Sequence, residues 1–160
     1  MTAHVVHRNR TSWWGLIPFA AATAIAAGIG GIGVSGTAAE YQSLDQPSWA
    51  PPSWLFGPVW TILYVMIALA GWLVWRRAGW TPALGVYAAQ LVLNAAWTPI
   101  FFGFGRPGLA LVDIVVLWVL IGATIYLFRP ISRTAAWLLV PYWAWVTFAT
   151  ALNAAIWQAN

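Results

Sequence analysis

Five long apolar segments, separated by short polar stretches, dominate this sequence. They cover residues 14–35, 56–75, 82–104, 107–128 and 134–157. About 20 residues of α-helix cross the hydrocarbon core of a bilayer, and each segment reaches that length. The pattern therefore predicts an all-α integral membrane protein, a bundle of five transmembrane helices that forms one domain over residues 1–160.

Amide and aromatic side chains recur at helical spacing within three of the predicted spans. The third span carries such a face at Gln90, Asn94, Trp97 and Phe101, and the fifth at Tyr142, Trp145, Ala149 and Asn153. The second span has a shorter face made of Trp60, Tyr64 and Gly71. An amide at membrane depth must face protein or a cavity, because lipid offers it no hydrogen bond. We therefore expect these faces to point inward. Asn94 and Asn153 would there either bind a ligand or join helices by hydrogen bonds.

Pro99 and Pro141 fall inside predicted helices. Each lacks the N–H that a helix uses, which leaves the carbonyl four residues earlier without a partner, at Ala95 and Trp137. We expect kinks at both positions that widen the bundle.

Residues 36–55 form the only connection long enough to have a structure of its own. Its prolines, Pro47, Pro51 and Pro52, hold the neighbouring backbone extended. Long ordered loops on rigid scaffolds often cover binding sites. We interpret the segment as a stiff external loop and a candidate lid over a cavity.

Charge is sparse and unevenly distributed. The chain is 62% hydrophobic and 6% charged, with no basic face that would hold phosphates, so we expect no nucleic-acid partner. With five spans, six of the seven arginines fall on the side of the N-terminal tail, residues 1–13, and only Arg106 falls on the other side. The positive-inside rule then predicts a multi-pass protein of the cell membrane with a cytoplasmic N-terminus and an external C-terminus.

The residue types limit the available chemistry. The sequence has no cysteine, and both histidines, His4 and His7, lie in the tail, so no metal site is expected within the membrane. No nucleophile–base set, carboxylate pair or phosphate-binding loop is evident, which argues against hydrolysis and phosphoryl transfer. Fourteen tryptophans point instead to membrane anchoring and to stacking on a flat ligand.

Several stretches together resemble the TspO/translocator-protein family, also called tryptophan-rich sensory proteins or peripheral-type benzodiazepine receptors. They are residues 47–56 (PSWAPPSWLF), 60–64 (WTILY), 90–103 (QLVLNAAWTPIFFG), 110–113 (ALVD) and 141–145 (PYWAW), followed by Leu152 and Asn153. The resemblance covers roughly residues 41–157 and implies five transmembrane helices, as the apolar pattern does.

The resemblance implies a membrane receptor, sensor or transporter whose cavity faces the first loop. Its ligands would be porphyrins such as protoporphyrin or haem, and isoquinoline or benzodiazepine compounds, with no obligatory cofactor. The implied ligand-binding residues are Trp49, Trp54, Trp60, Tyr64, Asn94, Trp97, Phe101, Trp145, Ala149 and Asn153.

Two other functions stay open. Some bacterial relatives are reported to degrade protoporphyrin with light and oxygen, and their tryptophans match Trp60 and Trp145, the catalytic candidates of an enzyme. Alternatively, the tryptophans serve only as membrane anchors of a protein that acts through helix packing.

The resemblance also bears on partners. It favours a homodimer through Gly85 and Ala89 in the third span over packing of this pair within the chain. It does not favour sterol binding, because no basic residue follows Tyr142 and the expected tyrosine is replaced near Ala154 and Ala155.

Overall fold

The protein is built from five long helices. The computed structural model describes residues 13–32 and 37–160. The long helices are α1 (Leu16–Ile32), α3 (Phe56–Ala78), α4 (Pro82–Thr98), α5 (Pro107–Phe128) and α6 (Arg133–Ala159). Together with the short turns that extend α1 and α4, all five are long and apolar enough to cross a membrane. The predicted five-span all-α membrane fold is therefore confirmed.

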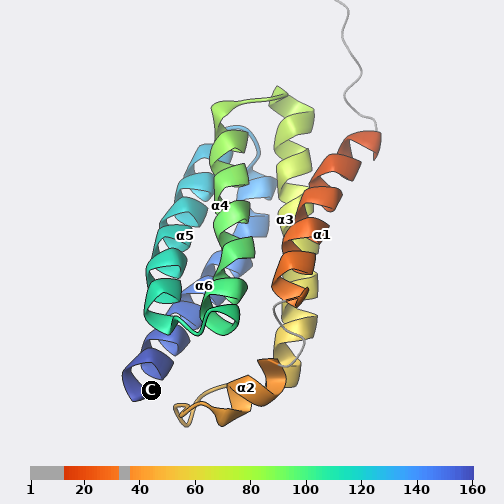
Figure 1. The fold of residues 1–160 in the computed structure, drawn as a ribbon. Helices are drawn as coiled ribbons and strands as arrows, with labels where there is room; N and C mark the ends of the chain where they lie inside the picture. The colour runs from red at the N-terminus through yellow and green to blue at the C-terminus, as the bar shows by residue number, and fades with distance from the viewer. Residues whose placement is uncertain (1–12, 33–36) are drawn as a thin grey trace, which may run out of the picture.

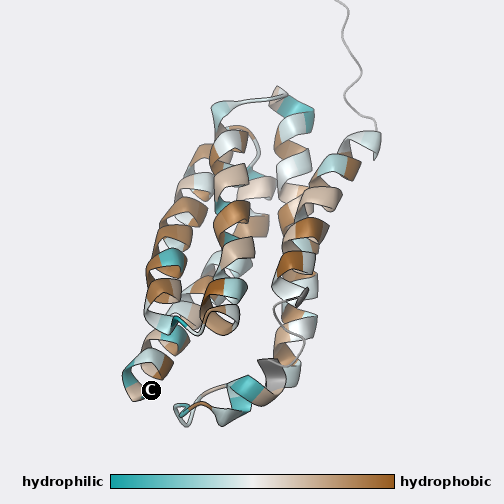
Figure 2. Cartoon of the chain, viewed as in Figure 1, coloured by the Kyte–Doolittle hydropathy of each residue, from teal (hydrophilic) through white to brown (hydrophobic). Residues whose placement is uncertain are grey.

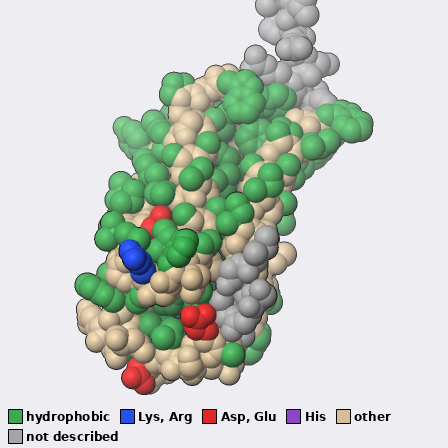
Figure 3. All heavy atoms as spheres, viewed as in Figure 1, with side chains coloured by type: hydrophobic (Ala, Val, Ile, Leu, Met, Phe, Trp, Pro, Cys, Tyr) green, Lys and Arg blue, Asp and Glu red, His purple; other side chains and the backbone are tan. Residues whose placement is uncertain are grey.

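The five helices close into a ring (Figure 1). Helix α1 packs between α3 and α4, α5 packs between α4 and α6, and α6 returns to α3. Apolar residues recur along the whole length of the long helices, as the colours of Figure 2 show. Hydrophobic side chains gather over the upper part of the face seen in Figure 3, which suits contact with lipid.

The two ends of the bundle carry different charges. The start of α1 and the α3–α4 and α5–α6 connections lie at one end, with Arg76, Arg77, Arg129 and Arg133. The other end holds the α4–α5 connection, the C-terminus and the short helix α2 (Thr37–Ser43). Glu40, Asp45 and Arg106 belong to this second end. Arg8 and Arg10, in the predicted cytoplasmic tail, lie outside the described residues, and the orientation in the membrane stays a prediction.

Pro99 and Pro141, which both fall inside predicted spans, have different effects on their helices. Pro99 starts a π-helical turn, Pro99–Gly103, in which the N–H of Phe104 donates to the Pro99 carbonyl at 2.9 Å. Such turns add a residue to the helical repeat and change the direction of the following side chains. Pro141 lies within α6, which runs as one helix through it.

The first connection is more regular than the sequence predicted. It contains α2 and the 3-10 turn Ser53–Leu55, which follows Pro52 in extended conformation. The hydroxyl of Tyr41 donates to the Pro51 carbonyl at 3.1 Å, and burial raises its pKa above the usual value. The side-chain amide of Asn160 bonds both the N–H and the carbonyl of Asp45, each at 3.1 Å. These bonds hold the loop folded on itself and against the end of α6.

Candidate ligand-binding cavity

A cavity of about 360 Å³ lies inside the ring of helices, in the half closer to α2. Its volume falls within the range of small-molecule sites, roughly 300–1,000 Å³. All five long helices contribute to the wall, and Tyr41 and Ser53 add residues from the first connection. The predicted external loop is therefore part of the cavity wall.

Small residues of α1 create part of this space. Ala27, Gly30 and Gly31 line the cavity. A Cβ atom added at Gly30 would lie 3.6 Å from the Thr98 hydroxyl oxygen, whereas one added at Gly31 would meet nothing within 4 Å. The absence of side chains here leaves room for a ligand between α1 and α4.

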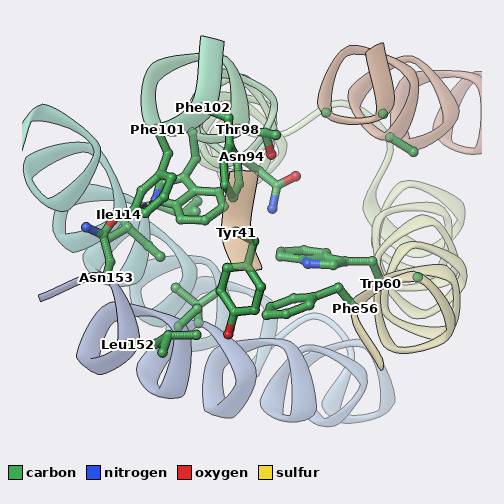
Figure 4. Close-up of a pocket in the computed structure, with 18 of the residues that line it drawn as sticks. Tyr41, Phe56, Trp60, Asn94, Thr98, Phe101, Phe102, Ile114, Leu152 and Asn153 are labelled. Atoms are coloured by element: carbon green, nitrogen blue, oxygen red, sulfur yellow. Dashed lines mark hydrogen bonds between the residues drawn. The ribbon is translucent and has the colours of Figure 1, made fainter. Parts of the chain in front are cut away.

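Two groups of aromatic rings face each other across the cavity (Figure 4). On α3, the ring of Trp60 lies 5.4 Å from that of Tyr64, and Phe56 lies beside Trp60 in the view. On the opposite side, the Trp97 and Phe101 ring centroids are 5.2 Å apart, and those of Phe101 and Phe102 are 4.6 Å apart. Aromatic walls of this kind offer a flat molecule stacking and edge contacts.

Polar side chains at the cavity wall are held by bonds between helices. The indole N–H of Trp97 donates to Asn153 Oδ1 at 3.0 Å, and Asn153 Nδ2 donates to the Pro107 carbonyl at 2.9 Å. The hydroxyl of Tyr64 donates to Asn94 Oδ1 at 2.7 Å, and Asn94 Nδ2 donates to the Tyr142 hydroxyl at 3.0 Å. Both asparagines therefore join helices by hydrogen bonds, which was one of the two roles expected for them. Both also line the cavity.

Seven of the ten predicted ligand-binding residues line the cavity: Trp60, Tyr64, Asn94, Trp97, Phe101, Ala149 and Asn153. The other three do not. Trp49 places its ring edge against Phe148, with centroids 5.7 Å apart, and Trp54 is 69% exposed. Trp145 lies next to Phe56, 5.9 Å between ring centroids. Ligand contacts of all ten residues stay predictions.

Several lining residues were not predicted from the sequence, above all Tyr41, Phe56 and Phe102. Phe102 was not expected beside Phe101, because neighbouring residues of an α-helix lie more than a quarter of a turn apart. The π-helical turn brings both rings to the cavity. Pro99, at the start of this turn, is the residue in the sequence that could have indicated the irregular geometry. Tyr41 gave no such signal, because the helix that positions it was not predicted.

The residues that line the cavity are mainly apolar and aromatic. Within residues 13–32 and 37–160, no group of three His, Cys, Asp or Glu side chains is placed to bind a metal ion. The lining offers aromatic faces, aliphatic side chains, and the polar groups of Tyr41, Ser53, Thr61, Tyr64, Asn94, Thr98 and Asn153.

The fold and the cavity define a multi-pass membrane protein with a small, mainly apolar cavity within its five-helix bundle. The chain belongs to the TspO/MBR family, whose model matches residues 16–158. It is 45% identical over 124 residues to the tryptophan-rich protein TspO of Chlorobaculum tepidum, covering 75% of this chain and 78% of that protein. It is 43% identical over 125 residues to the human translocator protein, covering 75% and 74% of the two chains. The tryptophan-rich sensory protein of Cereibacter sphaeroides is 43% identical over 113 residues, covering 71% of this chain and 72% of that protein.

Proposed function

We propose that this protein is a membrane receptor, sensor or transporter that binds porphyrins and similar flat, mainly apolar molecules in its cavity. The observation that carries the proposal is the pair of aromatic walls, Trp60 with Tyr64 and Trp97 with Phe101, on opposite sides of one cavity. A planar ring system placed between them contacts aromatic surface on both sides. The names of the relatives, translocator and sensory protein, agree with binding or transport and mention no reaction.

The cavity is small for a tetrapyrrole, so binding requires it to widen. About 360 Å³ is near the lower end of the range for small-molecule sites. A tetrapyrrole is a large ligand, so we expect the first connection, residues 37–55, to move when it binds. The connection is suited to this because its contacts with the end of α6 include the exposed bonds between Asp45 and Asn160.

The direct test is a binding titration of the purified protein in lipid nanodiscs with protoporphyrin. Saturable quenching of tryptophan fluorescence, whose amplitude scales with the protein and not with the lipid, supports the proposal. A linear, non-saturating signal equal to that of empty nanodiscs would show that the porphyrin only partitions into lipid, and the proposal would fail.

One observation favours an enzyme as the second candidate. The indole of Trp60 lines the cavity, so a bound porphyrin excited by light would lie against an oxidisable side chain. Trp145, the other candidate, does not line the cavity and packs against the Phe56 ring, which does. Dioxygen would supply the oxidising power. This reading requires a defined product that forms faster with the protein than without it.

We also propose a homodimer through α4. Gly85 and Ala89 are both exposed, and a Cβ atom added at Gly85 would meet nothing within 4 Å. The pair therefore gives a shallow surface on which a second helix can approach closely. Gly85→Leu should convert a dimer into a monomer in light scattering of the detergent-solubilised protein, whereas an unchanged mass would exclude this surface. We propose no sterol site.

A further inference from the structure

Four side chains from three helices form a continuous hydrogen-bonded chain that starts at the cavity. Tyr64 of α3 donates to Asn94 Oδ1 at 2.7 Å, Asn94 Nδ2 of α4 donates to the Tyr142 hydroxyl at 3.0 Å, and Tyr142 of α6 donates to Gln90 Oε1 at 2.8 Å. Tyr64 and Asn94 line the cavity, while Tyr142 and Gln90 are almost completely buried behind them. Figure 4 shows the Asn94 amide on the side of the cavity that faces Trp60.

The inner end of this chain is incomplete. Gln90 is 1% exposed, and its Nε2 has no hydrogen-bond partner among the described residues. A buried donor without a partner is unfavourable, and few are found in proteins. The outer end is incomplete as well, because the only hydrogen of the Tyr64 hydroxyl is used on Asn94. In this arrangement Tyr64 offers the cavity an oxygen lone pair, which makes it an acceptor.

The same side chains allow the opposite direction of donation. If both amides turn by 180°, Gln90 Nε2 donates to Tyr142, Tyr142 donates to Asn94 Oδ1, and Asn94 Nδ2 donates to Tyr64. The number of bonds within the chain stays the same, because Tyr142 again donates once and accepts once, while Tyr64 accepts a bond from Asn94 in place of the one that it donated. The hydrogen of Tyr64 then becomes free to point into the cavity, so that Tyr64 acts as a donor.

The two directions differ mainly in what stays unpaired at Gln90. In one it is the buried NH₂ group, and in the other it is the buried carbonyl oxygen together with one remaining N–H. The second N–H of Asn94 is present in both directions, so Tyr64 is the cavity group whose character changes. Since neither direction satisfies Gln90 completely, one new hydrogen bond to a ligand is enough to select between them.

We infer that this chain reverses with the ligand, and that Gln90 is a positioning residue that sets which hydrogen-bonding character Tyr64 shows to the cavity. The inference rests on the proposed function, that the cavity binds flat aromatic molecules. It extends that function by assigning ligand classes: planar aromatics that carry either a hydrogen-bond acceptor, such as a ring ketone, or a donor, such as a pyrrole-type N–H, at one edge.

Gln90→Met gives the sharpest variant, because methionine has a similar shape and cannot bond strongly to Tyr142. The hydroxyl of Tyr142 would then have Asn94 Oδ1 as its only acceptor in the chain. A hydroxyl buried without an acceptor is unfavourable, so the variant should be locked in the direction in which Tyr64 donates. It should still bind ring ketones and should bind N–H donors less well.

Three planar probes of nearly equal shape test this in nanodiscs: carbazole with an N–H donor, fluorenone with a carbonyl acceptor, and fluorene with neither. Tyr64→Phe should weaken the binding of carbazole and of fluorenone about fivefold each, the worth of one ordinary hydrogen bond, and leave fluorene unchanged. A loss confined to one of the two polar probes would mean a fixed direction and would overturn the inference. This comparison does not depend on any variant of Gln90.

The second comparison tests the role of Gln90. Gln90→Met should weaken carbazole about fivefold and leave fluorenone unchanged or slightly stronger, and the same substitution should have no such effect in a Tyr142→Phe background, where the chain is cut. Equal changes for both polar probes, or an undiminished effect in the Tyr142→Phe background, would show a merely structural role. If none of the probes, fluorene included, bound the wild type, the proposed function itself would fail and the inference with it.

Discussion

The indole N–H of Trp97 donates to Asn153 Oδ1 across 3.0 Å, and this bond ties α4 to α6 at the cavity wall. The amide of Asn153 is fixed in turn by its bond to the Pro107 carbonyl at the start of α5. The Trp97 ring, which packs at a tilt against Phe101, is therefore held in one orientation before any ligand arrives. A preorganised aromatic surface binds more tightly because less conformational freedom is lost on binding.

Replacing Trp97 should weaken porphyrin binding through loss of this surface. An aromatic stacking contact contributes roughly 1–3 kcal/mol, so Trp97→Ala should raise the Kd for protoporphyrin about 5- to 150-fold in a fluorescence titration. Trp97→Phe keeps most of the stacking surface and loses the bond to Asn153, so its effect should be smaller. Trp137→Ala is the matched control, because Trp137 is 71% exposed and does not line the cavity. Equal Kd values for the alanine variants of Trp97 and Trp137 would contradict a stacking role.

Removing the Tyr142 hydroxyl should destabilise the bundle. Tyr142 accepts from Asn94 and donates to Gln90, so Tyr142→Phe leaves one buried donor and one buried acceptor without partners. The free energy of unfolding should fall by about 1–3 kcal/mol, seen as a lower midpoint of thermal unfolding in detergent. Tyr126→Phe, at a residue that is 76% exposed, should leave the midpoint unchanged. A similar midpoint for both variants would mean that the hydrogen-bonded chain adds nothing to stability.

Gly71 of α3 should not tolerate a side chain. A Cβ atom there would lie 2.7 Å from Phe19 of α1 and 2.7 Å from Tyr87 of α4. Gly71→Ala should therefore push three helices apart and cost about 1–3 kcal/mol, measured by the same thermal unfolding. Gly28→Ala is the control, because a Cβ atom at Gly28 meets nothing within 4 Å and alanine favours the helix. A Gly71→Ala protein as stable as wild type would show that α1 moves away without cost.

Topology is testable with reporter fusions at each terminus. The positive-inside rule places the arginine-rich end, with Arg76, Arg77, Arg129 and Arg133, in the cytoplasm, because basic side chains resist transfer across the membrane. A reporter that is active only outside the cytoplasm should then work when fused to the C-terminus and fail at the N-terminus. The reverse result would overturn the proposed orientation while leaving the five-helix fold intact.

Substitution of Trp60 distinguishes a protein that only binds porphyrin from an enzyme that degrades it. Trp60→Phe keeps a flat apolar ring in the cavity wall, so protoporphyrin affinity should change little. Phenylalanine is much harder to oxidise than an indole, so a light- and oxygen-dependent reaction that uses Trp60 should slow strongly. We expect the rate of porphyrin loss under illumination to be the same in wild type and variant, since binding without catalysis is the proposed function. A large drop in rate with retained affinity would favour the enzyme instead.

The sequence by itself determined the five helices and the inward faces of three of them. Apolar runs of about 20 residues are sufficient to predict the helices, because a chain that crosses the hydrocarbon core must satisfy its backbone hydrogen bonds internally, as an α-helix does. The spacing of Asn94, Trp97 and Phe101 was sufficient to place them on one face, which the structure turns toward the cavity. Both results depend on periodicity along a single helix, which can be read without knowing its neighbours.

Only the tertiary structure decided what surrounds these faces. It placed Tyr41 in the cavity wall from α2, a helix within the connection that was predicted to be a loop. It also placed Phe102 beside Phe101 through the π-helical turn. It also brought Tyr142 of α6 between Asn94 and Gln90 of α4, 2.8–3.0 Å from each. The physical reason is that a cavity and a hydrogen-bonded chain between helices depend on the relative rotation and depth of each helix. Those quantities are fixed by packing among distant segments and leave no periodic trace in any one of them.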